Sequence, residues 1–404
     1  MTDNNENKVL NVPHLRFPEF SGEWKKHSLG EIGETIIGLT YKPSDVVDNN
    51  GIIVFRSSNI KNGMIDYSDL VRVNKHIKDK IITKENDILV CARNGSQRLI
   101  GKNAIIKQED ANNTFGAFMM VYRANDNPFI LPLLSTKKYF SQVGENLGAR
   151  INQITTSDFN GFEFYFPENH AERTKIAELF RLLDERIATQ NKIIEDLKKL
   201  KCAIIDYTFD NKTQSHRKRI LLSDVSAKIT RRNTDNQNFN VLSNSANQGI
   251  IPQNEVFDRE IANENNTSNY FVISQNDFVY NPRKSVTAPY GPINRYNGET
   301  NGVISPLYLC FRCYGIDVEY LGWYFKSDSW HKYVYQNGDT GVRHDRVSIK
   351  DEIFFSMPLY LHSTEEQMEI AKRLNKIESF VSQEEKYLFL LRSQKLYLLQ
   401  QMFI

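Results

Sequence analysis

The chain has 404 residues, enough for two or three domains that each bury a core, and its formal net charge is only +2. This small charge is spread evenly over both halves, which argues against an unstructured basic arm and leaves any nucleic-acid surface to be local. Four cysteines without a recognisable secretory leader predict reduced thiols and a cytoplasmic protein, and no apolar run approaches transmembrane length.

The first part of the chain predicts a β-rich globular domain. Residues 1–20 are expected to form a polar tail and an extended segment. Short runs of β-branched and aromatic residues between Asn, Asp and Gly then indicate strands, and Pro128–Val143 returns to a helical period. The expected strands are Ile52–Phe55, Lys80–Thr83, Ile88–Ala92, Asn103–Lys107, Ala117–Arg123 and Phe162–Phe166.

A long helix is predicted next, because apolar residues recur alternately four and three positions apart. The same pattern returns 194 positions later, and its two polar interruptions match: Gln190 corresponds to Glu384, and Lys201 to Lys395. Such a seam is typical of a helix that lies along another helix, whereas two ordinary core helices would not need matched interruptions. The seam residues are Ile176, Phe180, Leu183, Ile187, Gln190, Ile194, Leu197, Ile370, Leu374, Ile377, Val381, Glu384, Leu388 and Leu391.

Two further expectations concern this helix pair. If the helices are antiparallel and the seams overlap fully, Gln190 meets Glu384, Ile176 approaches Leu398, and Leu183 approaches Leu391. A second apolar stripe lies beside the seam, which implies either partner helices or burial against the chain's own globular domains. Its residues are Leu179, Leu182, Ile193 and Leu200 on the first helix, and Phe380, Tyr387 and Leu390 on the second.

The second half of the chain repeats the landmarks of the first. Asn86–Val90 returns as Asn276–Tyr280, whereas Phe55–Ile60 corresponds to Val241–Ala246 in position but not in chemistry. The sequence therefore predicts an α+β protein in which one scaffold is used twice with two different working surfaces. The expected segments are a tail (1–20), a first domain (21–167), a first long helix (168–208), a linker (209–218), a second domain (219–361) and a second long helix (362–404).

No catalytic motif is recognisable. The chain lacks His-Glu-x-x-His, a phosphate-binding Gly-x-x-x-x-Gly-Lys loop and a Gly-x-Gly-x-x-Gly turn. Cys310 and Cys313 lie in a strand-like run, where residues three apart point to opposite faces, which disfavours a zinc site. Asn281-Pro282 resembles the start of the Asn-Pro-Pro-aromatic motif of amino-methyltransferases, but Arg283 follows, so the second proline and the aromatic residue are missing.

Polar and basic loops follow equivalent strands in the two halves. Ile88–Ala92 leads into Arg93–Arg98, and Phe278–Tyr280 leads into Asn281–Ser285. Arg, Asn and Ser side chains can bind base edges and phosphates, although for one loop alone a solvated turn would be the better interpretation. The candidate DNA-contacting residues are Arg56, Ser57, Asn59, Arg93, Asn94, Ser96, Arg98, Arg150, Ser243, Asn244, Asn281, Arg283, Lys284 and Arg343, of which Arg150 and Arg343 could equally be structural.

Two different globular domains, each followed by a matching long helix, resemble the specificity subunit of a type I restriction-modification enzyme. The resemblance rests on residues 24–32, Phe55–Ile60, Asn276–Arg283, two glycine-containing loops (148–154 and 341–347) and the two helices, in an order repeated at about 194 residues. It implies two target-recognition domains, each for one half of a split, asymmetric DNA sequence. The helices would pack antiparallel as a coiled coil and fix the spacer between the half-sites.

The resemblance also implies partners for a chain that catalyses nothing and binds no metal or cofactor itself. Two modification subunits would bind S-adenosylmethionine and methylate adenine in double-stranded DNA. Two restriction subunits would supply the translocase and nuclease activities, which use ATP and magnesium. The alternatives are a stand-alone adenine methyltransferase with its own recognition domain, and a coiled-coil scaffold without a role on DNA.

Overall fold

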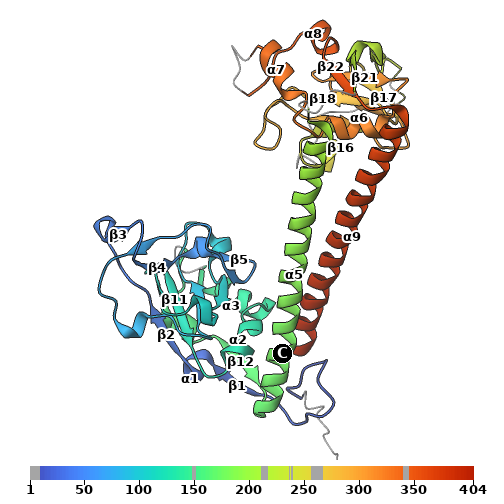
Figure 1. Cartoon of the computed structure of the whole chain (residues 1–404). Helices are drawn as coiled ribbons and strands as arrows, with labels where there is room; N and C mark the ends of the chain where they lie inside the picture. The colour runs from blue at the N-terminus through green and yellow to red at the C-terminus, as the bar shows by residue number, and fades with distance from the viewer. Residues whose placement is uncertain are drawn as a thin grey trace, which may run out of the picture. The chain divides into compact units, whose positions relative to one another are not determined.

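The computed structural model describes residues 10–147, 152–210, 217–235, 237, 240–255, 267–339 and 345–404. The chain divides into two compact units (Figure 1): the first comprises Met1–Asn191 with Lys386–Ile404, and the second Lys192–Glu385. Each unit contains two four-stranded sheets, a two-stranded sheet and a part of both long helices, and the first unit has a further two-stranded sheet, β5 with β6. The predicted α+β class is confirmed.

The central sheet of the first unit is antiparallel and covered on both faces. Along β8, Ile88 and Val90 pack into the core that contains Trp24, whereas Leu89 and Cys91 pack against the second sheet. Burial on both faces explains why this strand is a continuous apolar run rather than an alternating one. Across the sheet the strands are β2 (Glu34–Ile37), β11 (Met119–Arg123), β8 (Ile88–Cys91) and β9 (Asn103–Ile105).

The second sheet of this unit contains a parallel pair, β10 with β4, and its other pairs are antiparallel. A small hairpin follows β4, and its turn residues Asn62 and Gly63 both have positive φ, as a type I′ turn requires. The strands are β10 (Thr114–Phe115), β4 (Ile52–Phe55), β7 (Arg72–Val73) and β3 (Val46–Val47) in the sheet, β5 (Ile60–Lys61) with β6 (Met64–Ile65) in the hairpin, and β1 (Lys25–Ser28) with β12 (Glu163–Phe166) in the two-stranded sheet.

Short helices cover the central sheet, and two predictions need correction here. The expected strand Lys80–Thr83 is a 3-10 helix, Asp79–Ile81, followed by an extended end where Thr83 bonds to the backbone of Asn113. The helical stretch Pro128–Val143 is two helices, because the chain turns between residues 134 and 136. The helices are α1 (Leu29–Ile32), α2 (Asn127–Leu133), α3 (Lys137–Leu147) and α4 (Thr156–Asn160).

The extended segment near the N-terminus is tied to both long helices within the first unit. Arg16 binds Glu172 through two nitrogen–oxygen contacts of 2.7 and 2.8 Å, and the Leu15 N–H donates to the Gln401 carbonyl. The Glu172 carboxylate is buried and also accepts from the Trp24 indole, so its charge is fully compensated. This segment therefore belongs to the folded unit.

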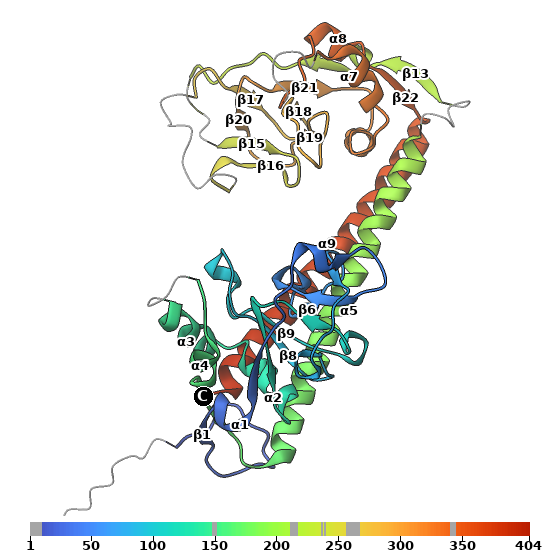
Figure 2. The same cartoon turned by 90° about the vertical axis from the view of Figure 1, so that its left-hand side faces the viewer.

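The second unit repeats the architecture of the first (Figure 2). Its central sheet has the order β14 (Ser226–Lys228), β21 (Leu309–Cys313), β18 (Phe278–Tyr280) and β19 (Ile293–Arg295). Its other sheet has the order β16 (Gly249–Pro252), β15 (Val241–Ser245), β20 (Gly302–Ile304) and β17 (Phe271–Ile273). The remaining elements are β13 (Lys218–Leu221), β22 (Pro358–Leu361), α6 (Val318–Tyr324), α7 (His331–Asn337) and α8 (Asp351–Phe355).

An ion pair on a buried aspartate marks the same place in both units. Asp87 binds Arg123 at 2.6 and 2.8 Å, and Asp277 binds Arg312 at 2.7 and 2.9 Å. Each aspartate also accepts a backbone N–H three residues upstream, from Lys84 or Ser274. The predicted internal duplication is thus confirmed in side-chain detail. The predicted alignment of Phe55 with Val241 is off by one residue. Phe55 pairs with Phe115, three residues before Phe118, and Leu242 pairs with Ile304, three residues before the corresponding Leu307. Phe55 therefore corresponds to Leu242.

The two long helices, α5 (His170–Phe209) and α9 (Thr364–Met402), are antiparallel in each unit. In the first unit, Lys395 binds Asp184 at 2.5 Å and Arg392 donates to Asn191 at 3.2 Å. In the second unit the ion pairs are Lys198–Glu385 and Lys201–Glu378, at 2.6 and 2.5 Å. In both units, the residue numbers of the partners on α9 decrease as those on α5 increase, which shows that the helices run antiparallel.

The C-terminal ends of both helices are anchored in globular cores. Phe403 lies 5.7 Å from Phe180 and 6.3 Å from Trp24 between ring centres, and Phe209 lies 5.3 Å from Tyr320 in the second unit. Full overlap of the seams would instead place Gln394 opposite Phe180. The contacts at this end are therefore displaced by several residues from the predicted register, because burial of the terminal aromatic side chain draws the helix further along its partner.

Each predicted seam residue is buried or half-buried. The pairing of Gln190 with Glu384 joins residues of different units and stays a prediction. In the second stripe, Leu179 packs into the first core, whereas five members remain exposed. These exposed residues are Leu182, Ile193, Leu200, Phe380 and Leu390. Within the described ranges, no helix has both the length and the apolar character needed to cross a membrane.

Candidate nucleic-acid interface

One edge of the central sheet in the first unit gathers the predicted recognition loop. Where β8 ends, the N–H groups of Ala92 and Arg93 both donate to the Phe118 carbonyl at 3.0 Å. On the other side, the Ile154 N–H donates to the Ala92 carbonyl at 2.9 Å, and Arg93 forms a β-bridge with Gln153. These backbone bonds hold the loop against the sheet on both sides. We call residues 93–98, Phe118 and residues 152–154 the first edge.

Two arginines of the first edge are available for a ligand. Arg93 is exposed, and its guanidinium lies 5.2 Å from the centre of the exposed Phe118 ring. Arg98 is also exposed, and within the described residues its side chain has no hydrogen bond or ion pair. Asn94, by contrast, fixes the shape of the loop, because its amide donates to Ser57 Oγ at 2.9 Å and accepts the Ser96 N–H.

The residues predicted after β4 are used within the protein. Arg56 forms an ion pair with Asp69 at 2.8 Å, and Ser57 accepts the bond from Asn94. Asn59 is fully buried; its amide donates to the carbonyls of Asp66 and Asp69 and accepts the Arg56 N–H. Asn59 therefore stabilises a loop, and the predicted role in DNA contact does not fit its burial.

The second unit builds an equivalent edge from different residues. Arg283 forms a β-bridge with Arg346, as Arg93 does with Gln153. The Lys284 N–H donates to the Asp345 carbonyl at 2.8 Å. Arg283 is exposed and Lys284 half-buried, and in the described part of the chain neither side chain has a hydrogen bond or ion pair. We call residues 281–285, Leu307 and residues 345–347 the second edge.

A buried amide network supports the second edge. Asn281 donates to the Asn244 carbonyl at 3.0 Å, and the Asn244 amide donates to the Val279 carbonyl at 2.7 Å. Asn294 donates to Asn244 Oδ1 at 2.6 Å. Asn244 and the neighbouring Ser243 are buried, so the predicted DNA contacts of these two residues do not fit the structure. Asn281 acts on the loop itself, since its side chain accepts the Arg283 N–H.

Two of the predicted DNA-contacting residues lie outside the described residues, and two residues of the edges were not predicted from the sequence. Arg150 and Arg343 lie outside the described residues, so their roles stay predictions. Phe118 and Arg346 were not predicted. Arg346 could have been predicted from its place in the repeated loop 341–347. The exposure of Phe118 could not have been predicted, because Phe118 lies in a strand-like run of the sequence.

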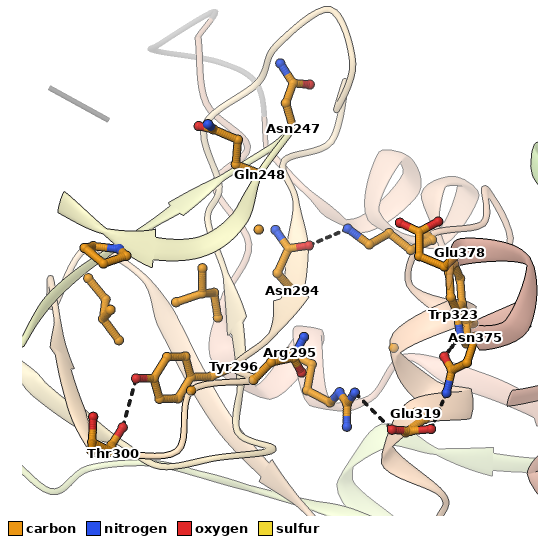
Figure 3. A pocket seen from close by; sticks show the side chains of 18 of the residues that line it. Asn247, Gln248, Asn294, Arg295, Tyr296, Thr300, Glu319, Trp323, Asn375 and Glu378 are labelled. Atoms are coloured by element: carbon orange, nitrogen blue, oxygen red, sulfur yellow. Dashed lines mark hydrogen bonds and ion pairs between the residues drawn. The ribbon is translucent and has the colours of Figure 1, made fainter. Parts of the chain in front are cut away.

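A polar cavity of about 620 Å³ lies in the second unit, and none of the residues that define the second edge lines it (Figure 3). Between its walls Arg295 binds Glu319 at 3.4 Å, and Trp323 donates to Asn375 at 2.9 Å. Lys326 donates to Asn294 Oδ1 at 2.6 Å. Arg295, Trp323 and Lys326 thus each bind another residue of the lining.

The described thiols and carboxylates were predicted not to form a metal site. Among the described residues, no three His, Cys, Asp or Glu side chains are placed to hold a metal ion. Burial raises the pKa of Cys310 to about 12 and that of Cys91 to about 11, so both thiols are protonated and unreactive at neutral pH. Asn281, which begins the partial methyltransferase motif, has its amide committed to the Asn244 backbone.

Comparison with known proteins shows which family the first part of the chain resembles. Residues 21–199 match the family model for the type I restriction modification DNA specificity domain. This part of the chain is therefore similar to a type I specificity domain. The resemblance inferred from the sequence is thereby confirmed.

Curated relatives agree with this assignment over part of their length. The EcoKI specificity subunit of Escherichia coli K12 is 27% identical over 194 residues, which cover 45% of this chain and 41% of that subunit. The StySPI specificity subunit of Salmonella potsdam is 27% identical over 194 residues, covering 45% and 42%. The match thus spans about two fifths of each relative.

Solved structures share the fold over nearly the whole chain. The S subunit of the type I restriction-modification system of M. genitalium superposes with a TM-score of 0.57 at 15% identity, covering 97% of this chain and 99% of that one. A chain from a structure describing complex assembly and conformational transition of a type I system gives 0.53 at 15% identity, covering 96% and 99%. At this identity the likeness supports the fold alone.

Proposed function

We propose that the chain is the DNA sequence-recognition subunit of a type I restriction-modification complex and has no catalytic activity of its own. The observation that carries the proposal is the pair of edges: one backbone frame presents Arg93 beside Gln153 in one unit and Arg283 beside Arg346 in the other. Two different edges on a duplicated frame suit an asymmetric target with two half-sites. Symmetric dimers recognise the two identical half-sites of a palindrome in a similar way, with one subunit on each half-site.

Each edge would lie in the major groove of its half-site. An exposed Arg can donate two parallel hydrogen bonds to O6 and N7 of guanine, which is the commonest specific contact, and Arg93 and Arg283 are the best placed for it. Arg98 and Lys284 would bind phosphates, which position the protein but carry no sequence information. Binding should therefore weaken steeply as the salt concentration rises.

The long helices would set the spacer and bind the partners. Two helices that pack only on each other need a single apolar stripe on each helix. Beside that stripe, however, Leu182, Leu200 and Phe380 are exposed. We infer that two modification subunits cover this second stripe. They would bring S-adenosylmethionine, and two restriction subunits would bring the ATP- and magnesium-dependent activities, all in the cytoplasm.

Mapping methylated adenines in the host genome, with and without this gene, tests the proposal. The expected result is one bipartite motif with a spacer of constant length, whose methylation disappears when the gene is deleted. Purified chain should transfer no methyl group from labelled S-adenosylmethionine to DNA by itself. An unchanged methylation pattern, or methyl transfer by the chain alone, would contradict the proposal.

A further inference from the structure

A large apolar side chain is exposed at the same place in both units, and the proposed recognition gives it no role so far. Phe118 is 60% exposed and Leu307 is 65% exposed. Each lies two residues before one of two equivalent residue pairs, which join β11 to β8 in the first unit and β21 to β18 in the second. These pairs are Met120 with Val90 and Leu309 with Tyr280.

The Phe118 backbone is bonded to the arginine loop, and the Leu307 backbone lies in a tight turn just before β21 pairs with β18. The Phe118 carbonyl accepts the N–H groups of Ala92 and Arg93, so the ring is fixed relative to the arginine loop. The Leu307 N–H donates to Ser305 Oγ at 3.3 Å. Their exposure is therefore a feature of the folded edge and does not come from a loose terminus or a long loop.

The surroundings of these side chains point to a nucleic-acid ligand. A single exposed leucine or phenylalanine is normal on a protein surface and indicates nothing by itself. Here the position coincides in two units whose edges otherwise differ, and in each unit the neighbouring strand leads into a loop with an exposed arginine, Arg93 or Arg283. In the first unit the Arg93 guanidinium lies over the Phe118 ring, which orients the arginine while leaving its N–H edge able to bind a base.

We propose that Phe118 and Leu307 each contact the C5-methyl group of a thymine, beside the base bound by Arg93 or Arg283. This inference rests on the proposed function and adds a specificity-determining residue to each unit. In the major groove the thymine methyl is the apolar group among base edges that otherwise present donors and acceptors, and a phenylalanine is a suitable partner for it. Insertion between base pairs is the other use of such side chains on DNA, but it occurs from the minor groove, where an arginine cannot reach guanine O6 and N7.

Deoxyuridine lacks only the methyl group of thymidine, so it isolates this contact. Each thymine of the first half-site is replaced in turn, and binding is measured with the full chain assembled with the modification subunits of its host. One replacement should weaken wild-type binding about fourfold, as expected for loss of one buried methyl group. Phe118→Ala should remove this response, and Phe118→Leu should retain it, because leucine occupies the equivalent position in the other unit.

Matched variants identify the site of the effect. Leu307→Ala should abolish the response only at a thymine of the other half-site. Phe140→Ala removes another exposed phenylalanine of the first unit, at the beginning of α3, and should leave the fourfold response intact.

The outcomes separate this inference from the function on which it rests. If no deoxyuridine replacement discriminates wild type from Phe118→Ala, or if the half-site has no thymine on either strand, the inference is wrong while DNA recognition stands. A rise in 2-aminopurine fluorescence that depends on Phe118 would show base unstacking and would also overturn it. Failure of the assembled wild-type complex to prefer its methylated motif over random DNA would instead contradict the proposed function.

Discussion

The two units share a frame and differ at their edges. Asp87 with Arg123 and Asp277 with Arg312 form the same ion pair, and the loops after β8 and β18 form equivalent β-bridges, Arg93 with Gln153 and Arg283 with Arg346. At the edges, by contrast, Gln153 is replaced by Arg346 and Phe118 by Leu307. Because backbone hydrogen bonds hold the loops, the side chains that face a ligand can change without disturbing the fold.

The buried residues and strands that pack next to the two edges also differ between the units. In the first unit Asn59 closes a short loop after β4, whereas in the second unit β15 continues into a hairpin with β16 and Asn244 joins β15 to β18. The two units have therefore diverged behind the edge as well as on it. The central sheet with its ion pair, the two-stranded sheet, the parallel pair of the second sheet and the helix ends are common to both units.

The largest expected effect comes from lengthening one of the two long helices. Inserting four residues after Gln190 adds about 6 Å of helix. If the helices set the distance between half-sites, the methylated motif should gain a longer spacer while both half-sites stay unchanged. The same insertion between Asn62 and Gly63, in an exposed hairpin turn, is the control and should leave the motif unaltered. An insertion mutant with the original spacer would contradict this role of the helices.

The shared ion pair should matter more in the first unit. Arg123 is 21% exposed and Arg312 is 59% exposed, so Arg312 can be hydrated when its carboxylate partner is lost. We expect Asp87→Asn to cost about 3 kcal/mol and Asp277→Asn about 1 kcal/mol. Hydrogen exchange of β8 and of β18, each in its own variant, measures these losses separately. Equal losses in the two units would show that the difference in exposure has no consequence.

The arginines of the edges should act on different half-sites. Arg93→Ala and Arg283→Ala should each weaken binding to the methylated motif by about 1–3 kcal/mol if the guanidinium binds a base edge. Binding to random DNA should change little. Arg219→Ala, an exposed arginine on β13, is the control of equal charge. A loss of the same size on random DNA would indicate a phosphate contact, and no loss on either DNA would exclude the loops from the interface.

The smallest effect concerns the thiols of the two cores. The pKa of Cys91 is raised to about 11 and that of Cys310 to about 12, so both remain protonated well above neutral pH. At pH 8, iodoacetamide should modify the exposed Cys202 first and leave these two protected until the chain unfolds. Mass spectrometry of tryptic peptides gives the order. Modification of Cys91 as rapid as that of Cys202 would contradict the burial of the first core.

The sequence was informative where a period or a repeat carried the signal. The heptad seam and the matched landmarks predicted both long helices and the duplication, because these depend on spacing alone. The roles of Asn59 and Asn244 were not accessible, since a buried amide in a β-rich protein depends on which distant carbonyls the fold brings to it. The register near the helix ends was missed for a similar reason: Phe209 and Phe403 lie beyond the predicted seam and are held by globular cores.

Replacement of residues 24–167 by the corresponding domain of another specificity subunit tests most directly whether each unit recognises its own half-site. Methylated adenines are then mapped in a host that carries the chimera. If the two edges act independently on a common frame, one half of the motif changes to that of the donor, and the other half and the spacer length are retained. A chimera that folds and methylates DNA but alters both half-sites, or neither, would contradict this account.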